Sequence, residues 1–100
     1  MIIKTTKTIL LVEDEPTIAM TEANTLKKHG YEVIIAYKGE EAVVIASENK
    51  EIDLILMDID LGKGIDGIEA AQIILQSREI PVVFFLSHAE SEIVERTEKI

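Results

Sequence analysis

Cysteine and tryptophan are absent from this 100-residue sequence. Without cysteine there are no disulfide bonds, zinc–thiolate sites or thiol nucleophiles. Basic residues are scarce, because 10 Lys and Arg stand against 19 Asp and Glu, for a net charge of -9. This charge opposes direct contact with nucleic acid or an anionic membrane surface. With no tryptophan and no basic stripe, no stacking platform for nucleic-acid bases is visible either.

Long hydrophobic runs are also missing. The apolar runs, of which 82–86 is one of the longest, are far too short to cross a bilayer. The acidic residues 13–15 directly follow the first run, which does not fit a signal peptide. We therefore expect a cytoplasmic protein with no membrane partner. The length and the lack of internal repeats predict one small domain.

Four short, continuous runs of apolar residues are present, rich in Val, Ile and Leu, at 8–12, 33–36, 54–57 and 82–86. They lack the in–out alternation of half-exposed strands, which is typical of parallel strands that are covered on both faces. Segments with helical periodicity lie between these runs. The alternation of strand and helix predicts an α/β fold with a parallel sheet and right-handed crossovers.

The predicted helices have recognisable ends. The first begins near Pro16 and stops at the run Lys27-Lys28-His29-Gly30, and the second spans about 40–48. The third opens at Asp66, with Glu69 placed as in a capping box, and a fourth starts near Glu90. The residues expected on the buried helix faces are Ala19, Ala23, Leu26, Ala42, Val43, Ala46, Ile68, Ala71, Ile74 and Leu75.

Reactive side chains follow three of the predicted strands. Glu13 and Asp14 follow the first, Asp58 the third and Ser87 the fourth, and the carboxyl ends of parallel strands share one edge of the sheet. Two carboxylates about 4 Å apart repel by roughly 4 kcal/mol, so a proton is retained or a cation binds. Mg²⁺ suits such a site because it needs few carboxylates and readily takes a phosphate oxygen. Asp58 is then a candidate nucleophile toward phosphorus, with Ser87 as a hydrogen-bond donor to a phosphoryl oxygen.

Three motifs in this order, ILLVEDEP (9–16), LILMDIDL (54–61) and PVVFFLS (81–87), resemble the receiver domain of two-component response regulators. The resemblance covers residues 8–100 and leaves 1–7 as an N-terminal extension. It implies a flavodoxin-like doubly wound parallel sheet in three α/β/α layers. The family's fifth strand, the lysine that follows it and the last helix have no counterpart before Ile100. We therefore expect a receiver that is incomplete at its C-terminus, with uncovered apolar surface that allows a dimer.

The resemblance also implies roles for individual residues. Asp58 is the phosphoacceptor, Asp14 is a direct Mg²⁺ ligand, Glu13 acts through a bound water, and Asp60 supplies its backbone carbonyl. Ser87 is the switch residue that moves toward the phosphoryl group. The donor is a phosphohistidine on a sensor histidine kinase or phosphotransfer protein, and a fused or partner output domain responds. The chain is then a signalling switch rather than a turnover enzyme.

Two other functions remain open at this point. Asp58 and Asp60 also resemble the nucleophile and acid of haloacid-dehalogenase-like phosphatases, and a degenerate receiver would serve only as a protein-interaction platform. Purely structural roles are open as well: Asp14 as a helix cap, Asp58 as a turn residue, and Ser87 with Glu90 as a capping box.

The loop after Asp58, 59–67, is longer than is usual in the receiver family.

Overall fold

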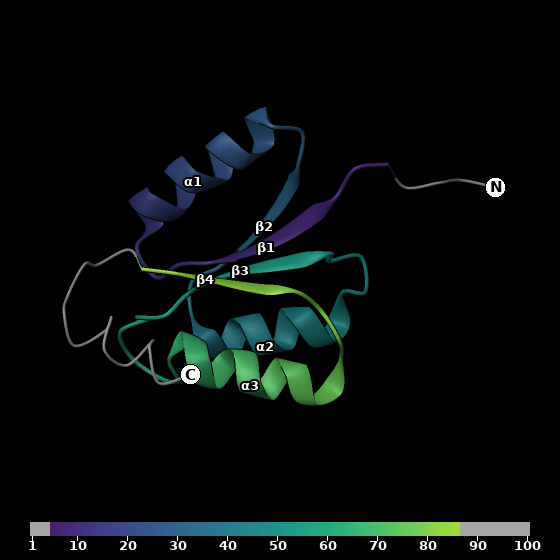
Figure 1. Cartoon of the computed structure of the whole chain (residues 1–100). Helices are drawn as coiled ribbons and strands as arrows, with labels where there is room; N and C mark the ends of the chain where they lie inside the picture. Colours follow the sequence, from purple (N-terminus) through teal and green to yellow (C-terminus); the bar gives the residue numbers. More distant parts are fainter. Residues whose placement is uncertain (1–4, 87–100) are drawn as a thin grey trace.

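A parallel sheet forms the centre of residues 5–86, the part of the chain that the computed structural model describes (Figure 1). Its strand order is β2-β1-β3-β4. The strands are β1 (Thr8–Val12), β2 (Glu32–Ala36), β3 (Leu54–Asp58) and β4 (Val82–Phe85). In the register of the central strand, Val12 lies beside Ala36 on one side and Met57 on the other. All four carboxyl ends therefore point to the same edge of the sheet.

Helices cover both faces of this sheet (Figure 1). Helix α1 (Pro16–Lys28) lies on one face, and α2 (Gly39–Glu48) and α3 (Gly67–Ser77) lie side by side on the other. This three-layer arrangement confirms the predicted doubly wound α/β fold. Among residues 5–86, no helix combines the length and the apolar composition that crossing a membrane requires.

Local sequence signals account for the ends of the helices. Pro16 occupies the first turn of α1, where its missing N–H is not needed. Lys27 and Lys28 are the basic residues of its last turn, and Gly30 follows with a φ of 92°, as the predicted stop requires. Asp66 caps α3, because its Oδ1 accepts a hydrogen bond of 2.9 Å from the Glu69 N–H.

The core lies mainly between the sheet and the α2–α3 layer. Within β1, Leu10, Leu11 and Val12 are completely buried, as expected of a central parallel strand. The helices contribute small residues such as Ala42 and Ala46, which let the helices approach the sheet closely. The core cluster comprises Leu10, Val12, Ala36, Ala42, Ala46, Ile52, Ile55, Met57, Leu61, Ala70, Ile74 and Ile80.

One expected core residue is wrong. Leu75 is 50% exposed, whereas its neighbour Ile74 is 2% exposed. The buried stripe of α3 is centred on Ala70, Ala71 and Ile74, and one further residue turns the side chain by about 100° around the helix axis. The buried face of α3 is therefore narrower than the apolar face that the sequence predicts. The fourth helix, expected from Glu90, lies outside the described residues.

Candidate functional site

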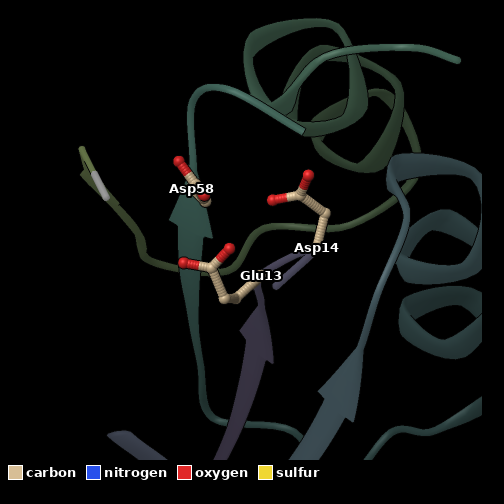
Figure 2. Close-up of side chains that lie close together, drawn as sticks. All are labelled: Glu13, Asp14 and Asp58. Atoms are coloured by element: carbon tan, nitrogen blue, oxygen red, sulfur yellow. The ribbon is translucent and has the colours of Figure 1, made fainter. Parts of the chain in front are cut away.

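Three acidic side chains, Glu13, Asp14 and Asp58, come together at the carboxyl edge of the sheet (Figure 2). Because β1 and β3 are adjacent and Val12 lies beside Met57, the residues that follow these two, Glu13 and Asp58, are also neighbours. One carboxylate oxygen from each of the three acids lies within 4.8 Å of the others. We call these three residues the acidic cluster.

The acidic cluster is buried on one side and open on the other. Glu13 and Asp58 are both 0% exposed, whereas Asp14 is half-buried. In Figure 2 the three carboxylates face a common space beyond the ends of the two strands. Asp14 is therefore the member of the acidic cluster that is accessible to solvent.

Hydrogen bonds hold two of these carboxylates in place. Glu13 Oε2 accepts from the Glu15 N–H at 3.0 Å, and Asp58 Oδ1 accepts from the Asp60 N–H at 3.1 Å. Within residues 5–86, Glu13 Oε1 and Asp14 Oδ1 are buried but have no hydrogen-bond partner. Burying an oxygen without a donor is costly, so this pair needs a proton or a cation.

The proton affinity of Glu13 reflects this crowding. The pKa of Glu13 is raised from 4.5 to about 8, mainly by burial, with smaller contributions from Asp14 and Asp58, while the hydrogen bond from the Glu15 N–H opposes the rise. The acids alone thus relieve their repulsion by keeping a proton on Glu13. A cation bound among them would relieve the same repulsion and release that proton.

The geometry and chemistry of the acidic cluster fit a hard divalent cation. All the side-chain atoms that could bind a metal here are carboxylate oxygens, and the two that have no hydrogen-bond partner are available as ligands. Glu22, on α1, is a further acid that sequence reasoning missed. Burial raises its pKa, and the charge of Asp58 adds to the rise. Glu22 lies in the middle of a helix and outside any motif, so the sequence carried no signal for it.

The structural alternatives for two of these acids have different outcomes. The helix-cap alternative for Asp14 is wrong, because the N-cap of α1 is Glu15 and no side chain caps this helix. Asp58 does make a turn-type hydrogen bond to the Asp60 N–H. This turn coexists with membership of the acidic cluster, since Asp58 is also within 4.8 Å of the other two acids.

Beyond Asp58, the chain makes a loop that returns to the strand end. The Gly67 N–H donates to the Ile59 carbonyl at 3.0 Å, and a Cβ at Gly67 would collide with the Asp58 backbone carbonyl. Gly67 is therefore a second residue that sequence reasoning missed, although its position after the helix cap Asp66 was a usable signal. Asp60 is half-buried, and its Oδ1 accepts from the Gly62 N–H at 3.2 Å. The predicted switch residue Ser87 lies outside the described residues.

Comparisons with known proteins agree with this architecture. The family model of the response regulator receiver domain matches residues 9–100. The phyllosphere-induced regulator PhyR of Methylorubrum extorquens is 43% identical over 83 residues, which cover 82% of this chain and 31% of that protein. The transcriptional regulatory protein PdtaR of Mycobacterium tuberculosis is 38% identical over 89 residues, which cover 88% of this chain and 42% of that protein. The chain thus spans less than half the length of these curated relatives.

A solved structure shows the same relationship in three dimensions. The N-terminal domain of a response regulator/sensory box/GGDEF 3-domain protein from Carboxydothermus hydrogenoformans superposes with a TM-score of 0.82. It is 49% identical, and the match covers 94% of this chain and 75% of that one. The matched fold, the family model and the acidic residues at the strand ends agree with one another, and the chain belongs to the family of response regulator receiver domains of two-component systems.

Proposed function

We propose that this receiver accepts a phosphoryl group on Asp58, with Mg²⁺ held by the acidic cluster. The observation that carries the proposal is the convergence of Glu13, Asp14 and Asp58 within 4.8 Å, with two buried oxygens that have no hydrogen-bond partner within the described residues. Asp14 and Asp58 would be direct ligands, Glu13 would act through a bound water, and the Asp60 carbonyl would complete the protein's share. When bound, the cation supplies positive charge that neutralises the carboxylates and the phosphoryl oxygens.

The chain's own residues prepare Asp58 for attack. The Asp60 N–H holds Asp58 Oδ1, which orients the carboxylate at the end of β3. A carboxylate oxygen forms a bond to phosphorus as the phosphorus–nitrogen bond of the donor phosphohistidine breaks. The bonding electrons leave with the imidazole, which takes up a proton. Ser87 would donate a hydrogen bond to a phosphoryl oxygen, as in our prediction from the sequence.

This function sets the wider organisation that we propose. Residues 8–100 form the receiver and 1–7 precede it, in line with the family model that matches 9–100. The phosphoryl donor is a sensor histidine kinase or phosphotransfer protein, and the response passes to a fused or partner output domain in the cytoplasm. The net charge of -9 supports a protein partner over direct nucleic-acid contact. The receiver would release its own phosphoryl group slowly rather than turn over a substrate.

Phosphorylation by acetyl phosphate tests the assignment. Asp58 would take the phosphoryl group as acetate leaves, and intact-mass spectrometry would show one added phosphoryl group that requires Mg²⁺. The Asp58→Ala variant should remain unlabelled. Asp66→Ser is the matched control, because it removes a carboxylate from the far end of the same loop but keeps a side chain that can cap α3.

The outcomes separate this proposal from the two alternatives. Labelling that persists in Asp58→Ala would reject the site, and no labelling of the unmodified protein would favour the degenerate receiver. Continuous release of phosphate from small phosphomonoesters would favour the phosphatase. The comparisons give that alternative no support, because the family model and the relatives named above are those of response regulators.

A further inference from the structure

The loop between Asp58 and α3 is tied to the first turn of α2 by one side chain. Glu40 Oε2 accepts a hydrogen bond of 3.1 Å from the Ile65 N–H, across 25 residues of sequence. Glu40 is exposed, and its carboxylate lies close to Gly64 and Ile65 of the loop. The contact therefore links the loop to the start of α2, and the hydrogen bonds of the sheet do not by themselves determine how these two segments are placed.

Two glycines make room for this contact. Gly64 has a φ of +84°, and a Cβ there would collide with the Glu40 carboxylate. A Cβ at Gly39, which opens α2, would lie 2.7 Å from Ile65 Cγ1 and 2.8 Å from the Ile65 carbonyl oxygen. A side chain at Gly39 would push the loop away from α2, and one at Gly64 would displace the Glu40 carboxylate, so both glycines suit the close approach that the Glu40 hydrogen bond requires.

The same loop contacts the acidic cluster. The Asp60 N–H binds Asp58 Oδ1, and the Gly62 N–H binds Asp60 Oδ1. A Cβ at Gly62 would lie only 3.1 Å from Asp14 Oδ2, so the loop backbone closely approaches the open side of the cluster. Leu61 anchors the start of the loop, since it is 2% exposed in the core. Residues 62–64 are exposed, and the Glu40 bond lies just beyond them.

We infer that Glu40 is a positioning residue, which holds the loop 59–66 against α2 so that the loop backbone at Asp60 and Gly62 keeps its place beside the acidic cluster. This inference rests on the proposed function, because the value of that placement lies in binding Mg²⁺ and the phosphoryl group. Hydrogen bonds from the Glu40 and Ile65 backbone N–H groups lower the pKa of Glu40, so its carboxylate stays ionised as an acceptor at neutral pH.

A comparison of three variants tests the inference. Glu40→Ala removes the acceptor, Glu40→Gln keeps an oxygen that accepts from the Ile65 N–H, and Glu41→Ala is the matched control. Glu41 belongs to the same first turn, has the same charge and also accepts a backbone hydrogen bond, but from Tyr37 at 2.9 Å. Glu40→Ala and Glu41→Ala therefore remove equal charge from the start of α2, while only one of them releases the loop.

Two measurements on the purified protein give the readouts. Hydrogen exchange with a chelator present should be faster at the Ile65 amide in Glu40→Ala than in Glu41→Ala, and Glu40→Gln should restore most of the protection. A titration with Mg²⁺ should show affinity weaker by about threefold to tenfold in Glu40→Ala, in the range expected for losing one hydrogen bond outside the ligand set. Glu40→Gln should return close to the original affinity, and urea unfolding should give similar stabilities for all three.

The results distinguish this inference from the proposed function. Equal Ile65 exchange and equal Mg²⁺ affinity in Glu40→Ala and Glu41→Ala would overturn the positioning role, even if Asp58 is labelled normally. Failure of Glu40→Gln to rescue either readout would overturn the hydrogen-bond explanation. An unmodified protein that binds no Mg²⁺ would instead overturn the proposed function, while the exchange measurement would still report on the contact between Glu40 and the loop.

Discussion

Replacing Glu13 with Gln should remove part of the pH dependence of stability. The folded state raises the pKa of Glu13 from 4.5 to about 8, mainly through burial. Between these two values the folded protein holds a proton that the unfolded chain has released. The stability that this proton contributes is complete below pH 4.5 and is lost as the pH rises through 8. Without metal, the protein should therefore become less stable from about pH 5 to about pH 8.5.

The size of this loss follows from the shift. One pKa unit corresponds to about 1.4 kcal/mol, so the whole shift would be equivalent to nearly 5 kcal/mol. Solvent reaches the acidic cluster through the half-buried Asp14 side, and this screening reduces the effect. We expect a fall of about 2 kcal/mol in the free energy of unfolding across the window. The glutamine that replaces Glu13 cannot ionise, while its side-chain oxygen still accepts from the Glu15 N–H, so the fall should disappear in the variant.

Urea unfolding followed by circular dichroism at pH 5.5, 7 and 8.5, with a chelator present, measures this effect. The quantity of interest is the difference in the free energy of unfolding between the unmodified protein and Glu13→Gln, because contributions that the two proteins share cancel in it. Glu41→Gln is the control, since it removes an exposed acid whose carboxylate accepts from Tyr37. At pH 8.5, Glu13→Gln should be about 2 kcal/mol more stable than the unmodified protein.

Magnesium should reverse this order of stability, so that the unmodified protein becomes more stable than Glu13→Gln. Mg²⁺ binds the ionised form of the acidic cluster, so its affinity should rise with pH up to about 8, where Glu13 releases its proton. At saturating Mg²⁺ the unmodified protein should gain more stability than Glu13→Gln, which lacks one carboxylate. If Glu13→Gln keeps the same slope of stability against pH as the unmodified protein, the burial argument for Glu13 is wrong.

Two further substitutions test contacts at the two edges of the sheet. Gly67→Ala should lower the free energy of unfolding by about 2–3 kcal/mol, measured with urea, because the added Cβ would collide with the Asp58 carbonyl. Gly30→Ala is the control: its Cβ would meet no atom within 4 Å, and the positive φ alone should cost only about 1 kcal/mol. Arg78→Met should cost about 2–3 kcal/mol, since the guanidinium donates three hydrogen bonds of 3.0–3.1 Å to backbone carbonyls at the end of α2 and before β3. Arg78→Lys should recover only part of this loss, and a cost below about 0.5 kcal/mol for Arg78→Met would show that these bonds are replaced by water.

Short-range patterns were sufficient for the elements themselves. The apolar runs correspond to β1–β4, and the expected starts at Pro16 and Asp66 correspond to α1 and to the cap of α3. These signals are local, because a helix end or a buried strand depends on a few adjacent residues. The face of α3 was harder to predict. Leu75 is half exposed because the depth of the buried stripe depends on which neighbouring segments pack against it, and the residue spacing does not contain that information.

By itself, the sequence determined that acidic residues follow the first and third strands, and that parallel strands bring such residues to one edge. Only the tertiary structure decided that Glu13, Asp14 and Asp58 lie within 4.8 Å, that Glu13 is buried and holds a proton, and that Glu40 reaches the loop from another helix. The physical reason is that pKa shifts and contacts across 25 residues depend on distance and burial, which arise only when separate segments pack together.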